Sequence, residues 1–132
     1  MVVVDKKLMW QLLLTGLRVA CVRVLFQLPY VYRLKTMHPL AYIEWFTPFR
    51  SIDKPSGMYV ISPSTRQHQL YGEIIEISCI VRSCHLIPCA CVLDKSWTQD
   101  NVVDLCSSFY FNSYIDMHTF CMVKLGRIGC IK

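Results

Sequence analysis

Charged residues are scarce in this sequence, and glycine and proline are few. Asp, Glu, Lys and Arg make up 17% of the 132 residues and hydrophobic residues 54%, whereas an average soluble domain is about 25% charged. This scarcity of charge excludes intrinsic disorder, which requires low hydrophobicity and high net charge. The five glycines are isolated and there are six prolines, which excludes a collagenous filament and a glycine-rich phosphate loop.

Long uncharged apolar runs are also missing. A transmembrane helix needs about 20 consecutive apolar residues, and Arg18 interrupts the apolar stretch near the start of the chain. Residues 8–17 have the length of a signal-peptide core, but Gln11 and Thr15 interrupt them and no small-x-small cleavage site follows. We therefore expect no membrane partner and no secretion, and a nuclear or cytoplasmic location.

Paired catalytic residues are absent as well. The nine Asp and Glu residues form no recognisable motif. A nucleophilic cysteine requires a histidine within hydrogen-bond reach, and the adjacent Cys84 and His85 would point to opposite faces of a strand. The sequence therefore predicts that the protein is not an enzyme and uses no cofactor.

Cysteine is the one reactive residue type that is abundant. Seven of the eight cysteines lie from Cys79 onward. A zinc site commonly uses paired Cys-x2-4-Cys knuckles, and the spacing here fits no standard pair. We therefore predict reduced, largely buried thiols and no metal, with a small zinc-stabilised or cysteine-rich binding module as the alternative. The candidate ligands for that alternative are Cys79, Cys84, His85, Cys89 and Cys91.

Hydrophobic alternation dominates the rest of the chain. It predicts strands over residues 17–28, 40–46, 58–62, 73–87 and 109–111. The first has a slip in its alternation after Cys21, the second has Ala41, Ile43 and Trp45 on its core face, and the fourth has a bulge or corner near 79–83. Loops are expected over 50–57 and, with polar residues, over 64–72. Short helices are expected over 99–106, with Leu105 inward, and over 116–120, with Asp116 as the cap. The predicted fold is mainly β, a small antiparallel β-barrel or rolled sheet with one or two short helices. Its parts would be a divergent and helical N-terminal segment (1–15), a single β-rich domain (16–121) and a flexible tail (122–132).

The net charge is mildly positive, at +5 with a pI of about 8.8. The basic residues are spread along the chain rather than clustered. This balance favours weak, non-specific attraction to polyanions and does not indicate specific nucleic-acid recognition.

Five blocks, taken in order, resemble a known family. They are LAYIEWFTPF at 40–49, SGMYVISPSTR at 56–66, IVRSCHLIP at 80–88, DKSWTQDNVVDLC at 94–106 and FYFNSYIDMHTFC at 109–121. Together with GLRVACVRVLFQLP at 16–29 they resemble the C-terminal region of fungal Kyakuja–Dileera–Zisupton (KDZ) transposases of the Plavaka group. The first residues, MVVVDKKLMWQLLL, depart from this resemblance.

The resemblance implies a transposon-derived module without activity of its own. In that family the catalytic carboxylates belong to an upstream RNase H-like core, for which this chain has no room, so no catalytic residue carries over. The expected function is a non-catalytic interaction module that contacts DNA non-specifically or a chromatin protein. The last aromatic strand is also faintly similar to bromo-adjacent homology modules, which bind chromatin proteins.

Overall fold

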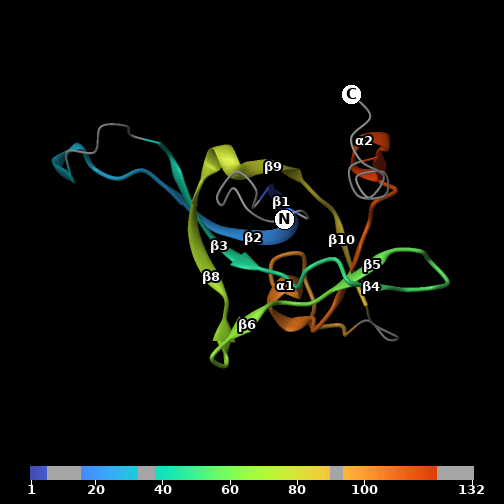
Figure 1. Cartoon of the computed structure of the whole chain (residues 1–132). Helices are drawn as coiled ribbons and strands as arrows, with labels where there is room; N and C mark the ends of the chain where they lie inside the picture. The colour runs from blue at the N-terminus through green and yellow to red at the C-terminus, as the bar shows by residue number, and fades with distance from the viewer. Residues whose placement is uncertain (6–15, 33–37, 90–93, 122–132) are drawn as a thin grey trace. The chain divides into compact units, whose positions relative to one another are not determined.

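The computed structural model describes residues 1–5, 16–32, 38–89 and 94–121. These residues form antiparallel sheets with short helices (Figure 1), which confirms the predicted mainly β fold. The strand orders are those of open sheets, so no closed barrel is found among the described residues. The predicted N-terminal helix falls mostly on residues outside these ranges, and so does the predicted tail.

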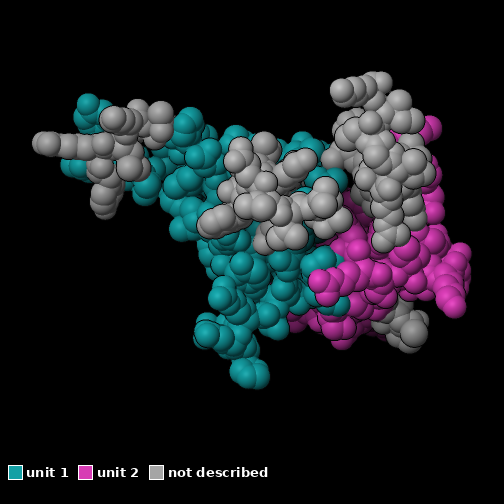
Figure 2. Space-filling model, in the orientation of Figure 1, with its two compact units in different colours: residues 1–48, 62–83 teal, residues 49–61, 84–132 magenta. Residues whose placement is uncertain are grey.

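The chain is divided into two compact units that alternate along the sequence (Figure 2). Unit 1 comprises residues 1–48 and 62–83, and unit 2 comprises residues 49–61 and 84–132. Each unit is therefore assembled from two separate segments of the predicted domain.

Unit 1 contains a five-stranded antiparallel sheet in the order β8-β3-β2-β1-β9. Strand β1 lies within the N-terminal segment that was expected to be divergent and helical, and it pairs with both β2 and β9. The strands are β1 (Val2–Asp5), β2 (Leu17–Phe26), β3 (Leu40–Trp45), β8 (Gly72–Glu76) and β9 (Ile80–Ser83). Two 3-10 turns, η2 (Tyr30–Tyr32) and η3 (Ile77–Cys79), complete this part of the unit.

The side chains of strand β3 alternate between the core and the solvent. Ala41, Ile43 and Trp45 are buried and Tyr42 is exposed, as the period of two in a strand requires. This confirms the predicted core face. The buried residues that pack with them are Val4, Ala20, Ile75 and Cys79.

A register shift in β2 accounts for its irregular hydrophobic pattern. The pairing with β3 slips between Val22 and Val24, which leaves Arg23 as the extra residue of a bulge. Its side chain forms an ion pair with Glu44, with Nε 2.7 Å from Oε2. The slip predicted for this strand is thus a bulge, and it places the Arg23 guanidinium beside the Glu44 carboxylate.

The predicted long strand over 73–87 is divided by a corner. Strand β8 ends at Glu76, the turn η3 follows, and β9 begins at Ile80. The corner lies slightly earlier than the predicted 79–83, and it places Cys79 in the core of unit 1.

Unit 2 is built on a four-stranded antiparallel sheet in the order β10-β11-β5-β4. Phe49 packs against Tyr59 and Phe111, with ring centroids 5.1 and 4.9 Å apart. The strands are β4 (Ser51–Ile52), β5 (Tyr59–Ile61), β10 (Leu86–Pro88) and β11 (Phe109–Phe111). The predicted loop between β4 and β5 is held by Asp53, whose carboxylate accepts hydrogen bonds from the N–H and hydroxyl of Ser56 at 3.0 and 2.6 Å.

The two helices of unit 2 are single turns. Helix α1 (Val102–Leu105) is shorter than the predicted 99–106, and Leu105 is exposed rather than inward. The preceding residues are held instead by a reciprocal pair of hydrogen bonds between Thr98 and Asn101. In α2 (Met117–Phe120) the predicted cap is confirmed, because Asp116 accepts a hydrogen bond from the Thr119 N–H at 2.8 Å.

Candidate nucleic-acid interface

A small hairpin in unit 1 occupies the segment that was predicted to be a polar loop. Strands β6 (Thr65–Arg66) and β7 (Gln69–Leu70) pair in register, and Gln67 and His68 form the two-residue turn between them. All six residues are exposed. Figure 1 shows the turn pointing away from the large sheet of the same unit.

The turn has an unusual backbone conformation for the residues it contains. Gln67 has a φ of 52° and His68 a φ of 64°, which corresponds to the type I′ turn favoured in two-residue hairpins. That turn normally uses Asn-Gly or Gly-Gly, since other residues lose roughly 1–2 kcal/mol each in the left-handed region. The chain therefore holds two long polar side chains at a strained turn.

The base of the hairpin is fixed to strand β3 through backbone hydrogen bonds. The Ser64 N–H donates to the Trp45 carbonyl at 2.7 Å, and the Trp45 N–H donates to the Tyr71 carbonyl at 2.9 Å. The Tyr71 N–H closes the set by donating to the Ser64 carbonyl at 2.8 Å. Because Trp45 is almost completely buried, the hairpin projects from a rigid support.

Two arginines stack on the aromatic rings beside this base. The Arg18 guanidinium lies 5.2 Å from the Trp45 ring and 5.8 Å from the Tyr71 ring, and that of Arg66 lies 5.7 Å from the Tyr71 ring. These distances are within the range of cation–π attraction. Arg18 thus joins the hairpin base to the sheet, and Arg66 is positioned at the start of the exposed turn.

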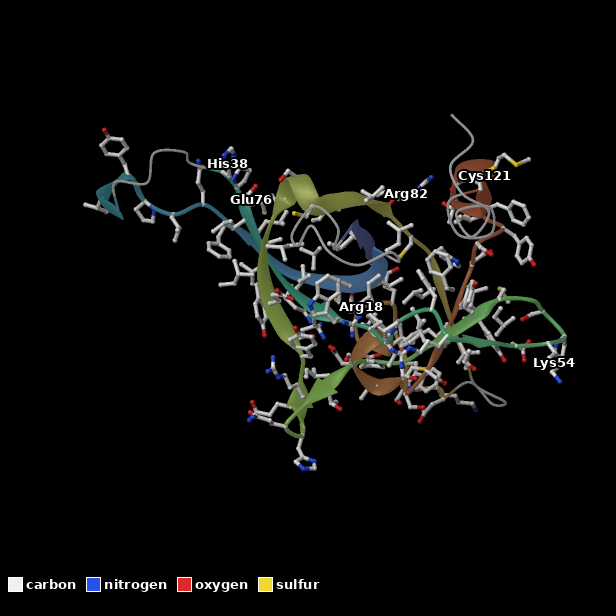
Figure 3. The ribbon with its side chains drawn as sticks, viewed as in Figure 1. Arg18, His38, Lys54, Glu76, Arg82 and Cys121 are labelled. Atoms are coloured by element: carbon white, nitrogen blue, oxygen red, sulfur yellow. The ribbon has the colours of Figure 1, made fainter. Side chains whose placement is uncertain are left out.

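Hydrogen bonds hold Arg18 and Trp45 in this arrangement. Arg18 donates through Nε to the Phe46 carbonyl at 2.5 Å and through Nη2 to the Ser64 hydroxyl at 3.0 Å. The Trp45 indole N–H donates to the Glu73 carboxylate at 2.7 Å. Arg18 is accordingly half-buried, whereas Lys54 points outward from the loop between β4 and β5 (Figure 3).

Opposite charges balance among the described residues of the unit that carries the hairpin. Unit 1 as a whole contains eight Lys and Arg against four Asp and Glu, but its described residues contain four against four. No carboxylate occurs between Ser64 and Tyr71. The side chains between the anchored ends of the hairpin therefore supply hydrogen-bond donors and one cation. The nearest acidic residue in the sequence is Glu73, whose carboxylate accepts the hydrogen bond from the Trp45 indole.

The cysteines singled out from the sequence do not assemble a metal site among the described residues. Cys79 is buried in unit 1, whereas Cys84, His85 and Cys89 belong to unit 2, and Cys91 lies outside the described residues. No group of three or more His, Cys, Asp or Glu side chains in the described ranges could hold a metal ion. None of the six cysteines in those ranges is joined to another by a disulfide.

Cys89 lies in a polar corner of unit 2 beside a second thiol. Its N–H donates to the Ser108 carbonyl at 2.9 Å, and the Cys106 thiol donates to the same oxygen at 3.0 Å. Partial burial raises the pKa of Cys89, and this outweighs hydrogen bonds from Ser108 and Tyr110 that lower it. The protonated thiol is therefore favoured, which is the opposite of the activated thiolate that a nucleophile requires.

The hairpin was missed at the sequence level because its turn lacks the usual signal. Neither Gln67 nor His68 belongs to the residue types that mark a type I′ turn. The signal that the sequence does carry is an absence of acidic residues from 64 to 71.

The described residues contain no helix that is long and apolar enough to cross a membrane. Comparison of the chain with protein-family models, with curated proteins and with solved structures finds no match.

Proposed function

We propose that this chain is a non-catalytic module that binds double-stranded DNA through the β6–β7 hairpin. The observation that carries the proposal is the hairpin itself, which is exposed, anchored to a buried tryptophan and free of carboxylates. A two-stranded β-ribbon is an established shape for contact with a DNA groove.

Arg66 is the residue we assign to the phosphate backbone. It lies next to the turn, it is exposed, and its guanidinium lies 5.7 Å from the centre of the Tyr71 ring. An arginine held by stacking loses less side-chain entropy when it binds a phosphate than a mobile one does. The net charge of +5 of the whole chain favours a polyanionic partner in general.

The resemblance to KDZ transposases supplies the proposed context. Each of the five blocks that resemble the family contains at least one described strand or helix. The hairpin begins within the second block, at Thr65 and Arg66. We therefore propose a module similar to the C-terminal region of such a transposase, in which DNA contact would accompany a catalytic core elsewhere.

The experiment is a binding titration of the full chain against a fluorescent 20-base-pair duplex over a series of salt concentrations. Arg66→Ala is expected to lower affinity several-fold and to reduce the salt dependence by about one counterion, because one phosphate contact is lost. Lys54→Ala removes a cation from an exposed loop in unit 2 and serves as the control, with no expected change in affinity.

Two outcomes would contradict the proposal. The first is an absence of duplex binding at low salt, with or without binding to histones. The second is an equal effect of Arg66→Ala and Lys54→Ala, which would show only a general dependence on net charge.

A further inference from the structure

We infer that the hairpin enters the major groove and that Gln67 and His68 read base edges there, which gives the module a sequence preference. This inference rests on the proposed DNA binding and extends it from non-specific attraction to recognition. The residues that carry it are the two at the strained turn.

The length of the hairpin suits the depth of the groove. Ser64 and Tyr71 are anchored at the base of the hairpin, and three residues on each side, 65–67 and 68–70, lead from the base to the tip. At about 3.3 Å per residue the ribbon extends roughly 10 Å. The major groove is about 8.5 Å deep and 12 Å wide, and it admits two strands about 4.8 Å apart.

The residues at the turn have the chemistry of base readers. A glutamine amide can pair with both N6 and N7 of adenine, and an imidazole N–H can donate to a purine N7. Gln67 and His68 lie at the part of the ribbon that would reach the floor of the groove first. Arg66 lies one residue behind them, and its guanidinium lies over Tyr71 at the base of the hairpin, the end that would lie beside the phosphates at the rim of the groove.

The strained backbone at Gln67 and His68 indicates that these two side chains serve a purpose other than stability. Asn-Gly would form the same turn without the cost of placing longer residues at positive φ. Residues held in strained conformations occur preferentially where a ligand is bound. The base of the hairpin is fixed by three backbone hydrogen bonds, so the strain does not unfold it.

The test compares duplexes selected from a random library by the full wild-type chain and by the double variant Gln67→Gly/His68→Gly, which removes both side chains and keeps a sequence suited to the type I′ turn. The wild type is expected to enrich sites that contain an adenine next to a second purine, with roughly tenfold discrimination against a changed base pair. The double variant is expected to lose this preference, so that the duplexes it selects match the composition of the starting library. Arg66→Ala should weaken binding to all sequences by a similar factor.

The outcomes separate the inference from the proposed function. If both proteins bind duplexes but select the same sequences, or none, the inference is wrong and the proposed DNA binding stands. If neither binds any duplex, both are wrong. Thermal unfolding of the double variant shows whether it is folded. Because glycine adopts both turn positions without strain, its Tm should not fall below that of the wild type.

Discussion

Replacement of the strained turn by Asn-Gly should stabilise the protein. Gln67 and His68 both occupy the left-handed region, with φ values of 52° and 64°, and each costs roughly 1–2 kcal/mol there. Asparagine tolerates this region and glycine adopts it without strain, but glycine also adds about 0.5–1 kcal/mol of unfolded-state entropy. The double variant Gln67→Asn/His68→Gly should therefore gain about 1–2 kcal/mol, or about 4–8 °C in Tm.

Urea unfolding followed by tryptophan fluorescence measures this gain directly. The midpoint should rise while the slope of the transition stays constant, since the surface exposed on unfolding is unchanged. Gln69→Asn is a matched control, because it makes the same chemical change on strand β7 beside the turn. It should change stability by less than about 0.5 kcal/mol. An equal response to Gln67→Asn and Gln69→Asn would refute the argument from backbone strain.

Three further perturbations address other parts of the structure. Arg18→Lys should lower stability by about 1–2 kcal/mol in urea unfolding, because an ammonium cannot reproduce the stacked contact with Trp45; an unchanged midpoint would count against this. Gly72→Ala should destabilise by about 1–3 kcal/mol because the new Cβ overlaps the Tyr42 ring, and Tyr42→Ala in the same chain should reduce that cost in a double-mutant cycle. The pH dependence of the thiol-alkylation rate should show that the pKa of Cys89 lies above that of an ordinary cysteine, and an ordinary pKa would contradict this prediction. The stability that the protonated thiol contributes should be complete below the ordinary thiol pKa and should be lost as the pH rises through the raised pKa.

Local patterns predicted the parts of the fold that depend on local chemistry. The alternation around Ile43 and Trp45 identified β3 and its buried face, and Asp116 identified the start of α2. Strand β1 escaped prediction because its four residues are too few to show a clear alternation, and residues 1–15 were expected to form a helical segment. Its assignment as a strand requires the pairing with β9, about 80 residues later in the sequence.

Less of the candidate site than of the fold could be predicted from the sequence. The stack that supports the hairpin combines Arg18, Trp45 and Tyr71, which come from three distant parts of the chain. No spacing rule relates such residues, since sheet pairing alone brings them together. The candidate cysteine ligands are close together in the sequence, but Cys79 and Cys84 belong to different units.

The alternation of the two units along the chain determines the order in which they can fold during synthesis. The hairpin of β4 and β5 is complete by Ile61, but its neighbour β11 begins at Phe109, about 50 residues later. At about 5–20 residues per second a ribosome needs roughly 3–10 s to produce that partner. Throughout this interval β5 presents an unpaired edge with Tyr59 and Ile61 uncovered, which is a template for aggregation. The nascent chain is therefore expected to depend on a chaperone from the emergence of β5 until β11 follows.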